Sequence, residues 1–515
     1  MKRLAITLIL AAIPQINAVS YSAEIPELIG ILRSNTENQL FGTQIVPLGD
    51  QNRDGYADFI IWDFSMKASL FLGGPTLDTV PFMIIDTVQN RISNVGDIDG
   101  DSIPDFVVNG RFPSDWRLNA YLSGGGIDTV RDLWFGQDSL LPLGFTINGG
   151  DINSNGSAEL ISPDFSIQKL GLFELQAPID SIPDMVISPQ NLQSNEFNSF
   201  GEGIASGDFN GDDTTDLVVN LRRGGVRGEL WFYWGGSAFD TIPDLIIKRP
   251  GANIDGADLF GRVLVNLGDA NGDGFDDIYA QGGNDGDSLS FVYFCGPIID
   301  TLPDVTIVDI AEHAGAAGDI NNDGFMDLII SFAFQANSFS WVNVYYGGPN
   351  MDSLIDIRIN VGDIPGHRIL WGMNVAGVGD VNGDGIDDFA VASVKSTVGE
   401  VHVFAGNDLS TDVEILEETN LPTSFELYQN YPNPFNPETT IEFSLLKKEH
   451  VTLEIYNILG QKVRELVNKP ISLGNYRVSW DGTDDNNNTV ASGVYFYHLL
   501  AGEREVDSKK MILLK

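Results

Sequence analysis

One short segment recurs along the chain and constrains its fold more than any other feature. In its most regular copy, Asp269 to Ile278, oxygen-bearing side chains occupy positions 1, 3, 5 and 9, glycine occupies position 6, and an apolar residue occupies position 10. Alternate residues of a tight loop can point toward one centre. Side-chain oxygens from positions 1, 3 and 5, the carbonyl of position 7 and the carboxylate of position 9 would form an all-oxygen cage, which suits Ca²⁺ better than Mg²⁺. Glycine permits the positive φ of the sharp bend.

The segment occurs seven times, and the first positions of neighbouring copies lie 47 to 61 residues apart. A period of about 50 residues is typical of a propeller, a solenoid or another repeat array. The sequence therefore predicts up to seven Ca²⁺ ions. The candidate metal ligands, taken from positions 1, 3, 5 and 9 of each copy, are Asp50, Asn52, Asp54 and Asp58; Asp97, Asp99, Asp101 and Asp105; Asp151, Asn153, Asn155 and Glu159; Asp208, Asn210, Asp212 and Asp216; Asp269, Asn271, Asp273 and Asp277; Asp319, Asn321, Asp323 and Asp327; and Asp380, Asn382, Asp384 and Asp388.

Two other interpretations explain these loops less well. An EF-hand needs a bidentate Glu at position 12 and a helix on each side, but position 12 is never acidic, and β-rich runs such as Phe59–Ile61 follow the loops. Plain Asp-Gly or Asn-Gly hairpin turns would explain the glycine, but not the acids at positions 1, 5 and 9. The copies that begin at Asp97 and Asp151 are those for which a bound ion is least expected. Ser102 replaces glycine in the first of them, as Asp213 does in the fourth copy, and the Asp151 copy has only two carboxylates.

Composition limits the possible partners. The 515 residues include 72 acids and 29 bases, for a formal net charge of −43. Nucleic acid is excluded as a partner, because phosphate contacts require Lys and Arg. The single cysteine, Cys295, allows no disulfide within the chain, and its apolar surroundings in the sequence predict a buried, inert thiol.

The N-terminus has the pattern of a secretory signal peptide, predicted for residues 1–18. A charged start, Met1–Arg3, precedes a short apolar run that ends at Ile13, and Ala18 offers a small residue for cleavage. The alternative is a buried N-terminal strand. No other apolar run is long enough to span a bilayer, so no transmembrane segment is expected after cleavage.

Residues 25–418 are predicted to form an all-β, seven-bladed β-propeller. Each repeat contains four short strand-like runs, which in the fifth repeat are residues 259–267, 278–280, 290–294 and 305–308. Seven units of four antiparallel strands are typical of this architecture. One strand is left over, because residues 25–29 copy residues 242–246 of a repeat's last strand. It is expected to pair with the last blade and close the ring, or to compete there with residues 412–416.

The repeats resemble the FG-GAP repeats of integrin alpha-subunit propellers. Phe-Gly precedes the first strand as Phe41-Gly42, Phe200-Gly201 and Phe260-Gly261, with Trp371-Gly372 as a variant, and the Asp-rich loop follows. The resemblance implies calcium between the first and second strands, and partners on the opposite face. That face would include residues 110–119, 222–228 and 362–371. The candidate contact residues are Phe112, Trp116, Arg223 and Trp371, unless these are ordinary loop and packing residues.

Residues 421–515 are predicted to form a small Ig-like β-sandwich, with strands at 440–445, 451–456, 474–480, 493–500 and 510–514. The domain resembles the type A C-terminal sorting domain of type IX secretion, through Tyr431–Phe435, Leu459–Val463, Ser492–Phe496 and Lys509–Met511. The resemblance implies recognition by the type IX secretion machinery and an extracellular or outer-membrane-surface location in a Bacteroidota-like bacterium. An ordinary accessory Ig-like domain is the alternative.

Three functions remain compatible with the sequence. The first is a secreted or cell-surface adhesion module that binds an extracellular protein or glycan. The second is a lectin-like carbohydrate-binding propeller, and the third is a polysaccharide-active enzyme. No nucleophile elbow, zinc-protease motif or phosphate loop is present, and the metal loops account for most paired acids. A protein that is not an enzyme is therefore expected, and the first function is preferred.

Overall fold

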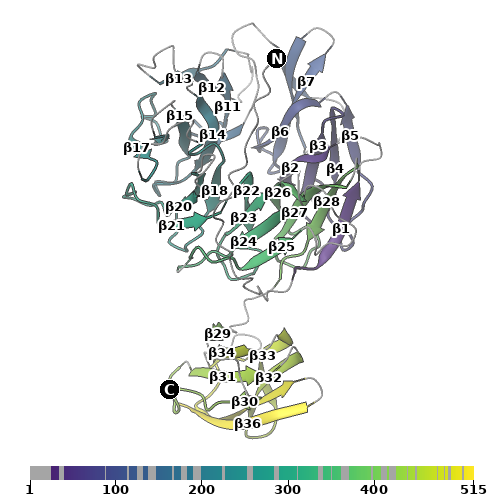
Figure 1. Ribbon diagram of the computed structural model, residues 1–515, viewed down its shortest axis with the longest axis vertical. Coiled ribbons are helices and arrows are strands. Elements are labelled where there is room, and N and C mark those ends of the chain that lie inside the picture. The colour runs from purple at the N-terminus through teal and green to yellow at the C-terminus, as the bar shows by residue number, and fades with distance from the viewer. Residues whose placement is uncertain are drawn as a thin grey trace, which may run out of the picture.

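The computed structural model is all-β, with seven four-stranded antiparallel sheets followed by a two-sheet sandwich (Figure 1). The structure describes residues 25–33, 40–86, 88–112, 115–123, 132–136, 147–164, 168–174, 182–189, 199–222, 227–251, 259–282, 289–309, 311–333, 340–349, 351–360, 371–395, 398–407, 414–416, 425–437, 439–446, 449–471, 474–480, 482–484, 489–501 and 504–514. The predicted signal peptide, residues 1–18, lies outside them. Within these ranges, no helix is long and apolar enough to cross a membrane.

Each propeller sheet is one blade, and its strands follow one another along the chain in six of the seven blades. Blade 1 contains β2 (Phe41–Gly49), β3 (Asp58–Asp63), β4 (Lys67–Phe71) and β5 (Met83–Asp86); blade 2 contains β6 (Val88–Gly96), β7 (Asp105–Phe112), β8 (Asp115–Tyr121) and β9 (Leu133–Gly136); and blade 3 contains β10 (Ile147–Gly150), β11 (Glu159–Asp164), β12 (Lys169–Glu174) and β13 (Met185–Ile187). Blade 4 contains β14 (Ser199–Gly207), β15 (Asp216–Arg222), β16 (Glu229–Tyr233) and β17 (Leu245–Lys248); blade 5 contains β18 (Leu264–Gly268), β19 (Asp277–Gln281), β20 (Leu289–Tyr293) and β21 (Val305–Val308); and blade 6 contains β22 (His313–Gly318), β23 (Asp327–Phe332), β24 (Trp341–Tyr345) and β25 (Ile357–Asn360). Blade 7 contains β26 (Trp371–Gly379), β27 (Asp388–Lys395), β28 (Val398–Phe404) and, from the start of the chain, β1 (Leu28–Arg33).

The second strand of each blade is rich in apolar residues, and nearly all of its residues with described side chains are buried, on both faces of the strand. In β3 all six residues are buried, and in β19 all five are buried. A strand buried on both faces is expected where each sheet packs between two neighbours. One cluster of buried residues accordingly joins Ile329 and Val344 of blade 6 to Val375 and Phe389 of blade 7. The core is therefore a series of layers between blades.

The Phe-Gly pairs lie at these layers. Phe41, Phe200 and Phe260 are buried. The glycines that follow them have positive φ, and a Cβ at Gly42 would lie 2.7 Å from the Cβ of Ala392 in blade 7. Only glycine fits so close to the preceding blade. The pair lies at the start of the first strand in blades 1 and 4, but the strand predicted over residues 259–267 of blade 5, which includes the pair, is wrong at its start. There Gly261 lies in a turn, with φ of +70°, and β18 begins only at Leu264.

The leftover N-terminal strand closes the ring, as predicted. β1 pairs antiparallel with β28, and Leu32 lies opposite Val401. Blade 7 thus takes three strands from its own repeat and one from the start of the chain. The competing segment does not occupy this edge, because β29 (Glu414–Leu416) pairs with β34 of the sandwich.

The C-terminal sandwich has one sheet in the order β29-β34-β31-β30 and another in the order β33-β32-β35-β36. Its strands after β29 are β30 (Glu426–Leu427), β31 (Thr439–Leu445), β32 (Glu449–Asn457), β33 (Lys462–Ile471), β34 (Gly474–Trp480), β35 (Gly493–Ala501) and β36 (Arg504–Leu513). Trp480, Phe435 and Tyr497 belong to its core. All five predicted strands are present, but β30 and β33 were not predicted, and β29 lies upstream of the predicted start of this domain at Leu421.

Candidate metal centres

The Asp-rich loops occupy the same place in every blade, between the first and second strands. In blade 5, β18 ends at Gly268, the loop begins at Asp269, and position 9, Asp277, is the first residue of β19. Position 9 begins the second strand in all other blades as well. Strand geometry therefore fixes both ends of each loop, as the repeat pattern predicts.

The carboxylate at position 1 holds the bend closed. In blade 5, Asp273 N donates to Oδ1 of Asp269 over 3.0 Å, and Gly274 N donates to Oδ2 over 2.9 Å. The corresponding pair of bonds is made to the first residue of the other six loops, Asp50, Asp97, Asp151, Asp208, Asp319 and Asp380. A carboxylate offers about four lone-pair sites, so these bonds orient it and leave capacity for a cation.

Positions 3 and 5 form consecutive Asx turns. In blade 5, Oδ1 of Asn271 accepts a 2.8 Å bond from Asp273 N, and Oδ1 of Asp273 accepts a 3.2 Å bond from Phe275 N. Such bonds to backbone two residues onward are the usual turn chemistry of Asn and Asp. The same two bonds recur at Asn52 and Asp54, Asp99 and Asp101, Asn153 and Asn155, Asn210 and Asp212, Asn321 and Asp323, and Asn382 and Asp384.

The position 9 carboxylate differs from the others because it is buried. Asp277 is fully buried, and it accepts a 3.0 Å bond from Ala270 N and a 2.9 Å bond from Cys295 N. The equivalent residues are also buried: Asp58, Asp105, Glu159, Asp216, Asp327 and Asp388. A buried ionised carboxylate is costly unless a positive charge or several hydrogen bonds compensate it.

Burial raises the pKa of all seven position 9 carboxyls, and nearby acids, including the Asp at position 1 of each loop, raise it further, while backbone hydrogen bonds act in the opposite direction. The raised pKa is about 6 for Asp58 and Asp105, about 7 for Glu159, Asp216, Asp277 and Asp388, and about 8 for Asp327. Each loop therefore concentrates negative charge that a cation would relieve.

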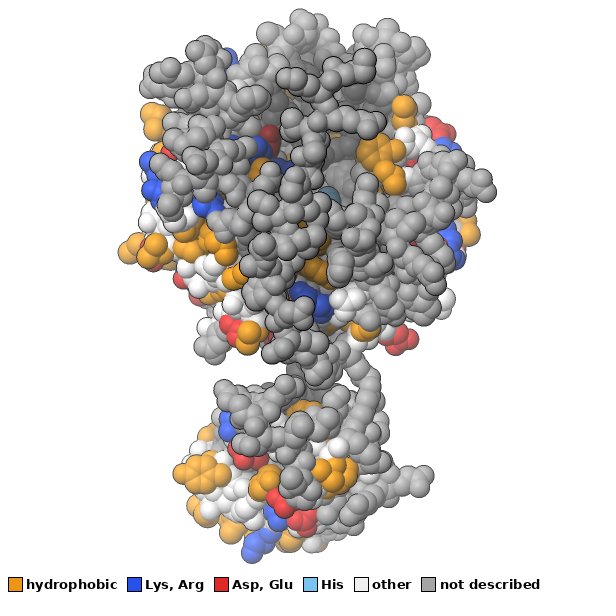
Figure 2. Space-filling model, viewed as in Figure 1, with side chains coloured by type: hydrophobic (Ala, Val, Ile, Leu, Met, Phe, Trp, Pro, Cys, Tyr) orange, Lys and Arg blue, Asp and Glu red, His pale blue; other side chains and the backbone are white. Residues whose placement is uncertain are grey.

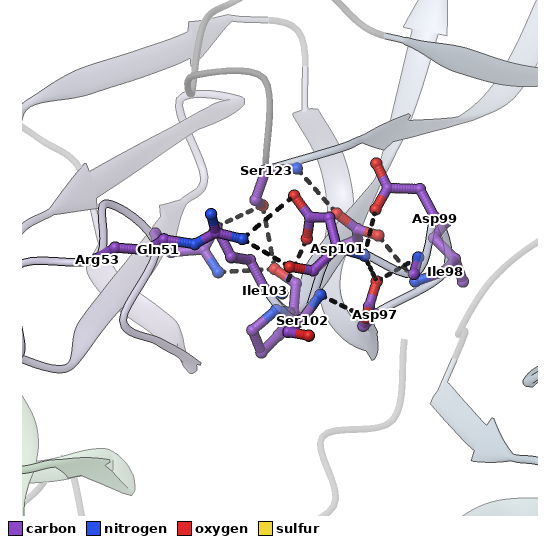
Figure 3. A network of polar contacts seen from close by, with 12 residues as sticks. Gln51, Arg53, Asp97, Ile98, Asp99, Asp101, Ser102, Ile103 and Ser123 are labelled. Atoms are coloured by element: carbon purple, nitrogen blue, oxygen red, sulfur yellow. Dashed lines mark hydrogen bonds and ion pairs between the residues drawn. The ribbon is translucent and has the colours of Figure 1, made fainter.

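The loop of blade 2 is the one with an acid at all four ligand positions. Asp97, Asp99 and Asp105 each offer an oxygen within 4.8 Å of the others (Figure 3). Two ligands on opposite sides of a Ca²⁺ ion lie roughly 4.6–5.2 Å apart, from Ca–O distances of about 2.3–2.6 Å, so this donor set fits the ion. Arg53 of blade 1 also reaches this loop, donating from Nη2 to the carbonyl of Asp101 over 2.6 Å. The acidic cluster suits cation binding, although this loop is one where an ion was least expected.

The irregular copies keep the shape of the bend. Ser102 and Asp213, which replace the position 6 glycine, have φ of 72° and 62°, in the region that glycine prefers. In blade 3, Glu159 stands in for Asp, and its longer side chain accepts bonds from Ile152 N at 2.8 Å and Asn153 Nδ2 at 2.6 Å. All 28 sequence-predicted ligands thus lie in loops of the predicted kind.

The candidate contact residues on the opposite face cannot be placed. Arg223 and residues 362–370 lie outside the described residues, and the side chains of Phe112, Trp116 and Trp371 are likewise not described. Elsewhere on the propeller, Figure 2 shows hydrophobic side chains exposed along the left margin, near β20 and β21 of Figure 1. Exposed apolar residues of blade 5 include Ile298, Leu302 and Val308.

Sequence reasoning missed two groups of residues around the loops. One is a pair of residues that follows the third strand in five blades, such as Gly347-Gly348, whose N–H groups bond to two different loops. The other is the aromatic residue at position 7: the ring of Phe325 lies so close to Gly272 of the preceding blade's loop that an added Cβ would be 2.2 Å from it. The recurring Gly-Gly pairs were the available signal for the first group.

Comparisons with known proteins agree with this architecture. Integrin alpha-7 of Mus musculus is 31% identical over 186 residues, which cover 35% of this chain and 14% of the mouse protein. Integrin alpha pat-2 of Caenorhabditis elegans is 29% identical over 225 residues, covering 38% of this chain and 18% of that protein. This chain contains an integrin alpha-like region. The integrin alpha-like matches span less than a fifth of these relatives' own length.

The C-terminal part matches a different family. Residues 435–502 match the model of the FlgD Ig-like domain, in agreement with the sandwich. A solved structure of PorZ, described as an essential surface component of the type-IX secretion system of Porphyromonas gingivalis, covers 90% of this chain and 65% of its own, at 13% identity and a TM-score of 0.28. So low a TM-score supports no argument about fold or function.

Proposed function

We propose that this chain is a secreted or cell-surface, calcium-binding propeller that acts as a non-catalytic adhesion or interaction module. The observation that carries the proposal is the repetition, in all seven blades, of one loop geometry with oxygen side chains at positions 1, 3, 5 and 9 around a buried carboxylate. A geometry kept in every blade, whatever the rest of the blade contains, points to a shared ligand and to a stabilising role.

Calcium suits the donor set better than other common ions. Every side-chain donor is a carboxylate or amide oxygen, which hard cations prefer, and His and Cys are absent from the four ligand positions. Up to seven ions would be held, one in each loop. A bound ion supplies positive charge against the acids and cross-links the bend to the start of the second strand.

Calcium binding can be tested directly on the mature chain. Isothermal titration calorimetry of metal-stripped protein with Ca²⁺ and, separately, with Mg²⁺ is expected to give several Ca²⁺ sites and much weaker Mg²⁺ binding. Elemental analysis after gel filtration gives the number of retained ions. Absence of heat with Ca²⁺, together with no retained ion, would rule the assignment out.

For a partner, we infer an extracellular protein or glycan that binds the face opposite the metal loops. Support comes from the integrin alpha-like region and from the candidate contact residues Phe112, Trp116, Arg223 and Trp371. The test compares binding of Trp116→Ala and Arg223→Ala to a glycan array and to a panel of purified extracellular proteins. Ile242→Ala is the matched control, since Ile242 is an exposed apolar residue in a turn between third and fourth strands. Loss of binding only in the control variant would contradict the assignment.

For export, we infer that the C-terminal sandwich directs the chain through type IX secretion. Support comes from the sorting-domain motifs and from the two-sheet fold that contains them. Removal of residues 421–515 is expected to leave the protein in the periplasm of a host that has this system. Undiminished appearance at the cell surface or in the medium would show that the sandwich is an ordinary accessory domain.

A further inference from the structure

The metal loops of neighbouring blades are connected by a repeating set of backbone hydrogen bonds. The key element, here called the turn dipeptide, is the pair of residues that begins two positions after the end of a third strand. The described turn dipeptides are Gly73-Gly74, Gly235-Gly236, Cys295-Gly296, Gly347-Gly348 and Gly406-Asn407.

The two N–H groups of each turn dipeptide serve different blades. In blade 7, Gly406 N donates to Oδ1 of Asp388, the position 9 carboxylate of the same blade, over 2.9 Å. The next N–H, of Asn407, donates to the carbonyl of Ile320 over 2.8 Å. Ile320 is position 2 of the loop in blade 6. The dipeptide therefore connects its own metal loop to the preceding one.

The connection continues through the preceding loop. Ile320 N donates to Oδ2 of Asp327 over 3.0 Å, and Asp327 is the position 9 carboxylate of blade 6. One residue of that loop, Ile320, thus lies between the turn dipeptide and the buried carboxylate: its N–H bonds the carboxylate, and its C=O accepts from the dipeptide. Asp388 and Asp327, candidate ligands in neighbouring blades, are thus linked by three hydrogen bonds and by the short backbone segments of Gly406-Asn407 and Ile320 that join them.

This arrangement repeats without interruption from blade 3 to blade 7 and across the ring closure into blade 1. The links from turn dipeptide to preceding position 2 carbonyl are Gly236 to Ile152, Gly296 to Phe209, Gly348 to Ala270, Asn407 to Ile320 and Gly74 to Val381, with N–O distances of 2.6–2.9 Å. Between blades 1 and 2 the link uses side chains instead: Ser123 N donates to Asp105, and Ser123 Oγ donates to Oε1 of Gln51.

The first residue of the turn dipeptide packs tightly between the metal loop of its own blade and that of the preceding blade. A Cβ on Gly347 would lie 2.4 Å from the carbonyl oxygen of Met326 in its own blade and 2.7 Å from that of Ala270 in the preceding blade. At Gly406 the corresponding distances are 2.3 Å to Asp387 and 2.9 Å to Ile320. Because the dipeptide is closely packed against both loops, a displacement of one loop must shift the next.

We propose that the metal loops bind calcium with positive cooperativity between neighbouring blades, and that the turn dipeptides transmit the coupling. The inference rests on the proposed calcium binding. An ion that fixes the position 9 carboxylate of one loop fixes its position 2 residue through that residue's N–H, and the C=O of the same residue holds the turn dipeptide of the next blade in place. That dipeptide then presents its first N–H to the next carboxylate, so the second site is already ordered when its ion arrives.

Direct electrostatic interaction between neighbouring loops predicts the opposite effect of one site's loss on calcium affinity at the adjacent site. Replacing Asp323 by Asn removes one negative charge, and the loss of its ion removes two positive charges. The net charge near the adjacent loop becomes more negative, so electrostatics alone would strengthen calcium binding in the adjacent blade. At 0.15 M salt this effect is weak, because charges separated by more than about 8 Å are largely screened. The hydrogen-bonded link instead predicts weaker calcium binding in the adjacent blade. The sign of the effect therefore separates the two mechanisms.

The experiment is a set of double-mutant cycles on the full mature chain, read by isothermal titration calorimetry with Ca²⁺. Asp323→Asn in blade 6 and Asp384→Asn in blade 7 form the linked pair. Asp384→Asn with Asp212→Asn in blade 4 forms the distant pair. The linked pair is expected to show positive coupling of about five-fold or more in calcium affinity, and the distant pair is expected to be additive within error.

The route is tested by repeating the linked cycle in two backgrounds. Asn407→Pro removes the N–H that reaches Ile320, whereas Asn407→Ala keeps it and is the matched control. Coupling is expected to disappear in the first background and to persist in the second. Three results would each overturn the proposal. They are additive effects of the linked pair in the wild-type background, tighter calcium binding in the adjacent blade, and coupling that persists in Asn407→Pro. Absence of any calcium binding in the wild type overturns the proposed function as well, so the two failures are distinguishable.

Discussion

Nε of Arg33 donates a 2.8 Å hydrogen bond to Oε1 of Glu400, joining two residues 367 positions apart in the chain. The bond lies across the seam where β1 completes blade 7. Glu400 is almost fully buried, while Arg33 is largely exposed. An ion pair that is open to solvent on one side adds little stability, so the apolar contacts of β1 must supply most of the energy of closure.

The first prediction concerns Leu32, a fully buried residue of β1 that lies opposite Val401. Leu32→Ala is expected to destabilise the propeller by about 2–5 kcal/mol, as buried Leu→Ala changes do, and to increase protease sensitivity. Urea denaturation measures the change in free energy of unfolding. Leu354→Ala is the matched control: Leu354 is 71% exposed, and its loss should change stability by less than about 0.5 kcal/mol. Equal effects of the two changes would mean that β1 does not close the ring.

The second prediction concerns metal removal. A ligand that binds only the folded state stabilises it by mass action, by about 2.7 kcal/mol for each site at 100 times its Kd. Chelation of the mature chain is therefore expected to lower the Tm markedly, and added Ca²⁺ should restore it. Differential scanning calorimetry measures both steps, and an excess of Mg²⁺ is the control. An unchanged Tm in chelator would mean that the loops have no stabilising ion.

The third prediction isolates one site. Asp273→Ala removes the position 5 carboxylate of blade 5 and the turn that it makes with Phe275 N. The protein is expected to bind one Ca²⁺ fewer, and hydrogen exchange should increase in blade 5. Asp300→Ala is the matched control, because Asp300 is an exposed acid of the same blade that makes a similar turn with Leu302 N outside the metal loop. A full complement of ions in Asp273→Ala would remove this residue from the ligand set.

Much of this architecture could be predicted because local chemistry determines it. The alternation of strand-like runs with Asp-rich turns predicted seven blades, and the copy of residues 242–246 at residues 25–29 predicted how the ring closes. Loop shape also follows from local residues, since the Asx turns at positions 3 and 5 need only side chains two residues from their donors.

The features that could not be predicted depend on contacts between blades. The N–H of Asn407 reaches Ile320 only because two blades pack side by side, and no local pattern records that distance. β33 escaped prediction because its polar residues interrupt the apolar pattern that marks other strands, and it is stabilised by its pairing with β32. The start of β18 was misplaced because the chain turns before it: Arg262 N donates to the carbonyl of Leu259, and the strand begins only at Leu264.

The fourth prediction concerns pH. In the metal-stripped protein, burial holds the pKa of Asp277 at about 7, against 3.8 for an ordinary Asp. A group whose pKa is raised by folding contributes stability that is fully present below the unfolded pKa and lost as pH rises through the folded pKa. With seven such carboxyls, the Tm of the stripped protein is expected to fall between about pH 4 and pH 8.

Calcium should oppose this trend, because the ion stabilises the ionised carboxylates and competes with protons for them. The measurement is a series of Tm values against pH, with and without saturating Ca²⁺. In stripped Asp277→Asn the slope is expected to be smaller, while Asp300→Asn should leave it nearly unchanged. A stripped protein whose Tm rises from pH 5 to pH 8 would contradict the prediction.

The last prediction concerns backbone strain at position 6. Ser102 has φ of 72°, where a residue with a side chain is strained, and its N–H is already bonded to Oδ2 of Asp97. Ser102→Gly keeps that bond and relieves the strain, but it also gives the unfolded chain more freedom. The left-handed conformation costs roughly 1–2 kcal/mol for a residue other than glycine, so a net gain of about 0.5–1 kcal/mol is expected. The reverse change, Gly274→Ser, should lose a similar amount, because Gly274 has φ of 91° and no atom lies within 4 Å of an added Cβ. Opposite shifts in the urea midpoint at saturating Ca²⁺ would isolate the backbone as the cause, whereas shifts of the same sign would show that the serine hydroxyl contributes to the loop.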